Sequence, residues 1–220
     1  MSERNDLKFS QDWFSKNLAE ILYWVKPTVK EIKKPKILEI GGFEGRSTRW
    51  FIENFLKDGG ELHCIDTWEG SLEHDQWEMD FSSIYDMFQH NLREYIDDGS
   101  CIVHRGMSKD ILPKLLADGH QFDFIYVDGE HNACGLLEDL VLSWKLLKVG
   151  GLMLIDDYEM ETLDPWFYTS HKQFHSTPRL RFTHPRIAID AFRNIYRGQY
   201  ETIIDNYQIG LQKVLNFPQK

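Results

Sequence analysis

The chain has 220 residues, a formal net charge of −10 at pH 7 and a hydrophobic content of 42%. This length and composition suit one globular domain with a sizeable core, so we predict a single domain over residues 1–220. Nucleic acid is a poor partner for so acidic a chain, because phosphate backbones attract surfaces rich in lysine and arginine. No segment approaches the roughly 20 apolar residues of a membrane span, so no membrane partner is expected.

The cysteines and the first residues indicate a cellular compartment. Cys64, Cys101 and Cys134 are odd in number and lack CxxC spacing, which argues against a disulfide framework and a zinc knuckle. The charged residues near Met1 are not followed by the apolar stretch of a secretory signal. We therefore expect a cytoplasmic protein with a small-molecule substrate, and homo-oligomerisation stays open.

The order of elements follows from hydrophobic spacing and from glycines. Apolar residues three or four apart indicate helices, and short apolar runs that end at polar or glycine residues indicate strands. The first half reads as an N-terminal helix within residues 1–35 with a break near Pro27, strand Lys36–Ile40, helix 47–57, strand Glu61–Asp66 and a helical insert at 71–98. The second half reads as strand 100–104, helix 111–116, strand Phe122–Val127, helix 134–147, strand 152–155 after Gly150-Gly151, helix 186–197 and two strands within 200–215 joined near Asn206.

Strands that alternate with helices indicate a parallel sheet covered on both faces. The last two strands break this alternation and form a hairpin, which places an antiparallel strand at the end of the chain. We predict an α/β fold with a doubly wound, mostly parallel seven-stranded sheet and a terminal antiparallel hairpin.

A glycine-rich turn joins the first strand to its helix. The segment reads Glu39-Ile40-Gly41-Gly42-Phe43-Glu44-Gly45-Arg46-Ser47. Glycine permits positive φ and lets a ligand approach bare backbone, and free N–H groups at the following helix start suit a polar or anionic group. A dinucleotide fingerprint, G-x-G-x-x-G, is not present, whereas the carboxylate of Glu39 could meet a cationic amino-acid head group. An ordinary strand-to-helix turn is the alternative.

Asp66 ends the second strand, 25 residues after Gly41. In a doubly wound sheet an acid at this place accepts hydrogen bonds from the two hydroxyls of a ribose. The nearby Trp68 could cover an adenine face. The alternative for Asp66 is a surface turn residue.

These motifs resemble those of class I S-adenosylmethionine-dependent methyltransferases. The similarity is to small-molecule O-methyltransferases with Glu-Ile-Gly…Glu-Gly-Arg-Ser, Asp-Thr-Trp and Val-Asp-Gly-x-His motifs, and it covers roughly residues 36–215. It implies a Rossmann-like methyltransferase fold with S-adenosylmethionine as cofactor. The cofactor-binding residues that we predict are Glu39, Gly41, Gly42, Gly45, Ser47, Asp66, Trp68, Ser108 and Asp128. Ser108 could instead cap the helix that follows it.

Acids follow two later strands of the predicted sheet. Asp128 directly follows the strand Phe122–Val127, and Asp156-Asp157 directly follow the strand 152–155. Converging carboxylates repel one another without a counter-charge, and a hard cation such as Mg²⁺ with oxygen ligands relieves this repulsion. Related metal-dependent O-methyltransferases use acids at these two strand ends, so we predict Asp128, Asp156 and Asp157 as metal ligands. The alternative is that Asp156-Asp157 cap a loop and Asp128 binds solvent.

His131 lies three residues after Asp128. Imidazole is the natural general base near neutral pH, so we predict His131 and Asp128 as catalytic residues. The resemblance points the same way, because a histidine in this motif is proposed as the base in sugar-modifying relatives. The alternative is that His131 orients Asp128 or caps the next helix.

The long segment 159–185 carries many aromatic residues and no clear periodicity. Such loops in compact domains are commonly lids or binding loops, so we predict a substrate lid here. The alternative is that its aromatic residues pack against the insert that holds Trp77 and Phe81, or against another subunit. The expected function is S-adenosylmethionine-dependent, Mg²⁺-assisted O-methylation of a small sugar-like or phenolic molecule. The alternatives are a metal-independent methyltransferase with another acceptor and a non-catalytic S-adenosylmethionine-binding module.

Overall fold

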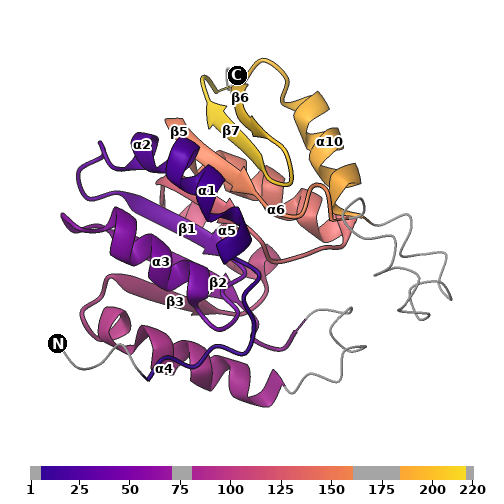
Figure 1. The fold of residues 1–220 in the computed structure, drawn as a ribbon. Helices are drawn as coiled ribbons and strands as arrows, with labels where there is room; N and C mark the ends of the chain where they lie inside the picture. Colours follow the sequence, from indigo (N-terminus) through magenta and orange to yellow (C-terminus); the bar gives the residue numbers. More distant parts are fainter. Residues whose placement is uncertain (1–5, 71–80, 161–183, 217–220) are drawn as a thin grey trace, which may run out of the picture. The chain divides into compact units, whose positions relative to one another are not determined.

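The structure is a computed structural model that describes residues 6–70, 81–160 and 184–216, and it comprises two units, Met1–Ser108 and Lys109–Lys220. Figure 1 shows the elements in sequence colours. The prediction of one domain over residues 1–220 stays a prediction. Most of the predicted lid, 159–185, and residues 71–80 of the predicted insert lie outside the described residues.

The first unit contains three parallel strands in the order β3-β2-β1. Its elements are η1 (Ser15–Asn17), α1 (Leu18–Glu20), η2 (Ile21–Val25), α2 (Lys26–Val29), β1 (Lys36–Ile40), α3 (Arg46–Phe55), β2 (Glu61–Asp66), η4 (Phe81–Ser83), α4 (Ile84–Asp97) and β3 (Cys101–Arg105). The bounds of β1 and β2 agree with those expected from their apolar runs. The core side of α3 is aromatic, with Phe51 and Phe55 buried and their rings stacked 5.7 Å apart.

The N-terminal helix changes type rather than breaking at Pro27. Its middle turn, η2, is a π-helix, and Pro27 is the second residue of α2 directly after it. Proline has no N–H to donate, and the π-type turn directly before it departs from the regular i−4 pairing, so the helix continues through Pro27. Ile21, Val25 and Val29 are completely buried and lie four residues apart, so one continuous face reaches the core across the change of helix type.

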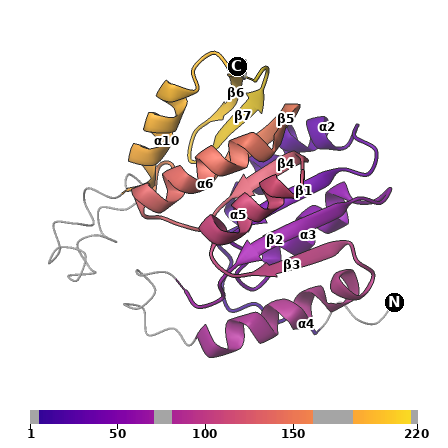
Figure 2. The same cartoon turned by 180° about the vertical axis from the view of Figure 1, so that it is seen from behind.

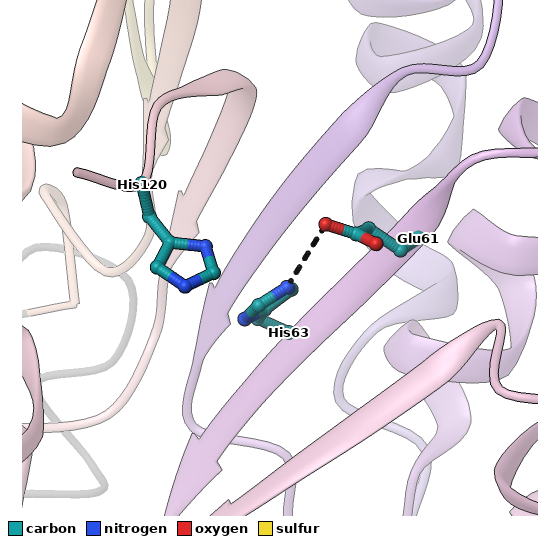
Figure 3. A group of neighbouring side chains, drawn as sticks. All are labelled: Glu61, His63 and His120. Atoms are coloured by element: carbon teal, nitrogen blue, oxygen red, sulfur yellow. Dashed lines mark hydrogen bonds and ion pairs between the residues drawn. The ribbon is translucent and has the colours of Figure 1, made fainter. Parts of the chain in front are cut away.

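A pair of histidines forms a polar contact between β2 and β3. His63 Nδ1 lies 2.9 Å from His104 Nε2, and His63 Nε2 lies 3.3 Å from Glu61 Oε1, as Figure 3 shows for Glu61. A carboxylate only accepts, so Nε2 of His63 carries the proton that this contact needs. Lys36 Nζ lies 2.7 Å from the same Glu61 oxygen, which links β1 to the pair. His120, drawn in the same figure, belongs to the second unit, where its ring stacks on Phe122.

The second unit contains four strands in the order β4-β5-β7-β6. Its elements are α5 (Ser108–Ala117, which starts at the last residue of the first unit), β4 (Phe122–Val127), α6 (Ala133–Leu146), β5 (Leu147–Ile155), α10 (Pro185–Ile195), β6 (Tyr200–Asp205) and β7 (Ile209–Lys213). β4 and β5 are parallel, whereas β7 runs antiparallel to both β5 and β6. This is the predicted terminal hairpin.

β5 begins earlier than predicted. The glycine pair Gly150-Gly151 lies inside the strand rather than before it, because Leu147 already pairs with Phe122. The register shifts between Phe122 and Phe124, and Gly150 has φ +86°. Glycine in a strand permits such a bulge, so the pair marks an irregularity in the strand and not its start.

A buried lysine closes the end of α6. The helices α6 and α10 lie side by side in both views (Figures 1 and 2), and Trp144 contacts Phe192 with ring centroids 5.5 Å apart. Lys213 on β7 is 2% exposed, and its Nζ donates to the carbonyls of Trp144 and Leu147 at 2.7 Å each. The last carbonyls of a helix have no intrahelical partner, so this ammonium both satisfies them and joins α6 to the hairpin.

Within the described ranges no helix is long and apolar enough to cross a membrane.

The Lys213→Met variant is expected to lower the free energy of unfolding by about 1–3 kcal/mol, because two buried carbonyls lose their donor while the side-chain volume is kept. Urea denaturation at pH 7 measures this. Lys145→Met makes the same chemical change at an exposed position of α6 and is expected to stay within about 0.5 kcal/mol of wild type. Equal effects of the two substitutions would contradict the helix-closing role.

Candidate active site

The glycine turn after β1 is shaped by close packing as well as by backbone conformation. Gly41 has φ 93° and Gly45 has φ 84°, and Gly45 is the N-cap residue of α3. A Cβ on Gly45 would lie 2.1 Å from Leu92 Cδ2, and one on Gly42 would lie 2.4 Å from Cys64 Sγ. Gly45 therefore combines a positive φ with close packing, and a side chain at Gly42 would have to displace the Cys64 thiol, whatever ligand the turn binds.

Asp66 fastens this turn to the end of β2. Its Oδ2 accepts from the N–H groups of Gly42 and Phe43 at 2.8 Å each, and its Oδ1 accepts from Trp68 N at 2.7 Å. A carboxylate offers about four lone-pair sites, so three backbone donors leave little capacity for the two hydroxyls of a ribose. The structure thus gives Asp66 a role in shaping the turn, and its predicted contact with ribose stays a prediction.

Glu39 is completely buried at the end of β1. Its carboxylate accepts hydrogen bonds from Ser47 Oγ and Thr48 Oγ1, both at 2.5 Å. Burial raises the pKa of Glu39 to about 7, although these hydroxyls favour the charged form. Glu39 is therefore poised between its neutral and charged forms near neutral pH, and a nearby cation would favour the charged form.

Of two further residues predicted to contact the cofactor, Trp68 is buried against the glycine turn and Ser108 begins α5. Trp68 has φ 55° and is 3% exposed; its Nε1 donates to Phe43 O at 2.8 Å, and its ring packs on Tyr85 and Phe88. The tryptophan thus supports the glycine turn and offers no open face to an adenine in this structure. Ser108 is the first residue of α5, one position after the N-cap, and both of its predicted roles stay predictions.

Residues 8–13 form a strap along the glycine turn, which sequence reasoning missed. Ser10 donates to the buried carboxylate of Glu44 through its N–H at 2.7 Å and its hydroxyl at 2.5 Å. Asn91 on α4 bonds both the N–H and the carbonyl of Lys8, at 2.8 and 2.7 Å, and also donates to Glu44 O at 2.8 Å. Trp13 packs on Phe43 with ring centroids 5.1 Å apart. Sequence periodicity does not reveal these contacts, because they join residues 30 or more positions apart.

The second unit gathers the predicted acids around two tyrosine hydroxyls. Tyr126 OH donates to Asp156 Oδ2 and lies 3.1 Å from Asp128 Oδ2. Tyr207 OH donates to Asp157 Oδ1, while Asp157 Oδ2 lies 2.9 Å from His131 Nε2. Sequence reasoning missed both tyrosines. Tyr126 had a signal, because it precedes Asp128 by two residues and strand residues two apart share a face; Tyr207 had none.

The carboxylates of Asp156 and Asp157 lie close enough to Asp128 to raise its pKa by charge repulsion. Burial, followed by the charges of Asp156 and Asp157, raises the pKa of Asp128 well above its usual range, and His131 opposes this rise. Burial and the same acids also raise the pKa values of Tyr126 and Tyr207, so both phenols stay protonated donors. Ligand atoms of Asp128, His131 and Asp157 all lie within 4.8 Å of one another. This donor set fits a divalent cation, whose charge would relieve the repulsion.

The three predicted metal ligands are not equally placed. Asp128 and Asp157 have atoms in that group together with His131, which was predicted as a base. Asp156 is 7% exposed and turns Oδ2 to Tyr126 and Oδ1 to the N–H of Asp157 at 2.8 Å. The structure thus assembles all four predicted residues within one unit, with Asp156 the most deeply held. Their roles stay predictions.

Comparison with known proteins shows the family of this chain. Residues 38–158 match the model of a methyltransferase domain family. The chain belongs to this family. O-methyltransferase hkm8 of Aspergillus hancockii is 29% identical over 145 residues, which are 66% of this chain and 50% of that protein. The match thus spans only half the length of that relative.

Solved structures show the same fold. The O-methyltransferase NovP has a TM-score of 0.63 at 19% identity, covering 91% of this chain and 80% of its own. MycE, from the mycinamycin biosynthetic pathway and in complex with Mg and SAH, has a TM-score of 0.53 at 14% identity, covering 86% of this chain and 48% of its own. The predicted doubly wound methyltransferase fold and the resemblance to methyltransferases are confirmed.

Glu39→Gln is expected to make the protein without cofactor more stable at pH 8. The folded-state pKa of about 7 lies above the ordinary value of 4.5, so the free energy of unfolding falls as the pH rises between these values. Above pH 7 the buried charge costs about 3 kcal/mol, which a neutral amide avoids. Urea denaturation should show a gain of about 2–3 kcal/mol at pH 8 and little change at pH 4.5. A loss of stability at pH 8 would contradict the raised pKa.

Asn91→Ala is expected to release the strap and weaken binding of S-adenosylmethionine by roughly tenfold, because Asn91 bonds both Lys8 and the turn residue Glu44. Isothermal titration calorimetry measures the affinity, and limited proteolysis reports whether residues 8–13 have become accessible. Gln89→Ala, at an exposed position of the same helix, is the control. A released strap with unchanged affinity would show that the strap does not support the cofactor turn.

Proposed function

We propose that this protein is an S-adenosylmethionine-dependent O-methyltransferase that acts, with the help of a divalent cation such as Mg²⁺, on a small hydroxylated molecule of sugar-like or phenolic type. The observation that carries the proposal is the group of Asp128, His131 and Asp157 in a chain of the methyltransferase-domain family. MycE, which has the same fold, is known with Mg and SAH, and this supports both the cofactor and the cation.

The cofactor is assigned to the glycine turn of the first unit. The residues proposed to contact it are those predicted above, with Asp66 and the buried Trp68 mainly shaping the turn. The carboxylate of Glu39 is the group that would meet the ammonium of the methionine part. Because the pKa of Glu39 is about 7 without a cation, binding of an ammonium there releases a proton near neutral pH.

A divalent cation would be held by the carboxylates of Asp128 and Asp157, with Asp156 as the third acid. When bound, it lowers the pKa of an acceptor hydroxyl and orients that hydroxyl for reaction. Oxygen ligands favour Mg²⁺ over softer metals, and an imidazole beside them is compatible with Mn²⁺.

His131 is proposed to take the proton from the acceptor hydroxyl. Its Nε2 faces Asp157 Oδ2 at 2.9 Å. Since the carboxylate only accepts, Nε2 carries the proton of a neutral imidazole, and Nδ1 holds the lone pair that can accept another. Asp157 then stabilises the imidazolium, as the acid of a histidine–aspartate pair does. The acceptor oxygen forms a bond to the methyl carbon, the carbon–sulfur bond breaks, and its electron pair stays on sulfur.

His131→Gln is expected to lower kcat by about 10²–10⁴-fold and to leave the affinity for S-adenosylmethionine unchanged, because it removes the base without altering the glycine turn. The assay is acceptor-dependent formation of S-adenosylhomocysteine over a panel of sugar and phenol acceptors. His90→Gln, on the surface of α4, is the control.

Calorimetry with and without Mg²⁺ separates this function from its alternatives. Binding of S-adenosylmethionine together with a Mg²⁺ signal that Asp128→Asn abolishes would support the proposal. Full activity in EDTA would indicate a metal-independent methyltransferase. No binding of the cofactor or its demethylated product at tens of micromolar protein would rule out the proposed function.

A further inference from the structure

The turn of the C-terminal hairpin holds the residues that follow β5. Residues 206–208 join β6 to β7, and Asn206 N donates to Gln208 O at 3.1 Å across this turn. Tyr207 lies in the middle of it. Its carbonyl accepts from Tyr158 N at 2.9 Å, and its hydroxyl donates to Asp157 Oδ1. Tyr207 therefore holds Asp157 through its own side chain and holds Tyr158 through its own backbone carbonyl.

Asp157 has an unusual backbone conformation that such a double contact stabilises. Its φ is 61°, in the left-handed region, which costs a residue with a Cβ some free energy and persists only when its surroundings fix it. Its own N–H donates to Asp156 Oδ1 at 2.8 Å. The backbone of Asp157 is thus turned sharply after β5, and the direction of its carboxylate depends on what that carboxylate contacts.

The two oxygens of Asp157 have different partners. Oδ1 accepts from Tyr207, and Oδ2 lies 2.9 Å from His131 Nε2. A hydroxyl carries one proton, so Tyr207 donates to Oδ1 alone, and this bond helps to hold Oδ2 toward His131. Loss of that bond removes one of the contacts that set the orientation of the carboxylate toward the imidazole.

We propose that Tyr207 is a positioning residue for the group of Asp128, His131 and Asp157. The Tyr207 hydroxyl holds the Asp157 carboxylate so that Oδ2 of Asp157 faces His131 and can also bind a cation. This inference rests on the proposed function, because it assigns a cation to the group. It extends the site to the β6–β7 hairpin, 50 residues after Asp157. Groups that hydrogen-bond metal ligands from outside orient them, and their loss weakens metal binding by roughly 10–100-fold.

Tyr207→Phe removes only the hydroxyl, and Mn²⁺ is the probe because its binding is measured directly by electron paramagnetic resonance. We expect Mn²⁺ affinity to fall about 10–100-fold in Tyr207→Phe. Tyr200→Phe is the matched control, since Tyr200 lies on the same hairpin and its hydroxyl donates to Arg193 O at 2.9 Å, away from the acids. We expect its Mn²⁺ affinity to stay within about twofold of wild type. Circular dichroism verifies that both variants are folded.

Wild-type Mn²⁺ affinity in Tyr207→Phe would overturn the inference while leaving the proposed function intact. If the wild-type protein binds no Mn²⁺, the cation in the proposed function fails, and a double-mutant cycle with Asp157→Asn then decides the positioning role. A drop in melting temperature from Tyr207→Phe that shrinks in the Asp157→Asn background would support the orientation of Asp157 by Tyr207. Equal drops in both backgrounds would overturn it.

Discussion

Buried and half-buried carboxylates need hydrogen-bond donors, and this requirement organises both units of the protein. In the first unit, Asp66 receives three backbone N–H groups and thereby sets the path of the glycine turn. Glu39 receives two hydroxyls from the first turn of α3, and Glu44 receives the N–H and hydroxyl of Ser10. An unpaired buried carboxylate would cost several kcal/mol, so each of these acids specifies the position of the segment that supplies its donors.

The second unit gathers its acids around two tyrosine hydroxyls and a histidine. Tyr126 and Tyr207 supply hydroxyls to Asp156 and Asp157, while Asp128 lies near both acids and has a pKa well above its usual range. A raised pKa favours the neutral form of Asp128, and a cation bound beside it would favour the charged form instead. The first unit therefore uses its carboxylates mainly to hold structure, and the second brings three acids together where we propose the chemistry.

Local sequence patterns predicted what depends on local structure. The strands Lys36–Ile40, Glu61–Asp66 and Phe122–Val127 have the expected bounds because each is a short apolar run that ends at an acid or a glycine. The start of β5 was wrong, since Gly150-Gly151 reads as a boundary in sequence but forms a bulge once Leu147 pairs with Phe122. The acids and His131 were found because motif spacing places them at strand ends.

Contacts between distant segments were out of reach of the sequence. The bonds from Asn91 to Lys8 and from Tyr207 to Asp157 join residues 83 and 50 positions apart, and neither residue belongs to a recognisable motif. The burial of Trp68 was also hidden, because a tryptophan after a strand looks the same in sequence whether it covers a ligand or supports a turn. The sequence thus predicted candidate residues for the chemistry, whereas the contacts that hold these residues in place depend on tertiary structure.

Three of the four described non-glycine residues with a positive φ lie beside the glycine turn or among the acids, and the fourth is Lys34. Phe43, Trp68 and Asp157 all have positive φ, which is uncommon for residues with a Cβ, and each is held by a contact to another segment: Trp13, Tyr85 and Tyr207 respectively. The strap at residues 8–13 and the hairpin turn at 206–208 therefore have the same role in their two units, which is to hold a residue with a positive φ in place. Each lies outside the motifs that name the family, and each fixes the geometry of a motif residue. Substitutions in these two segments can alter the site without changing any residue proposed to touch cofactor, cation or acceptor.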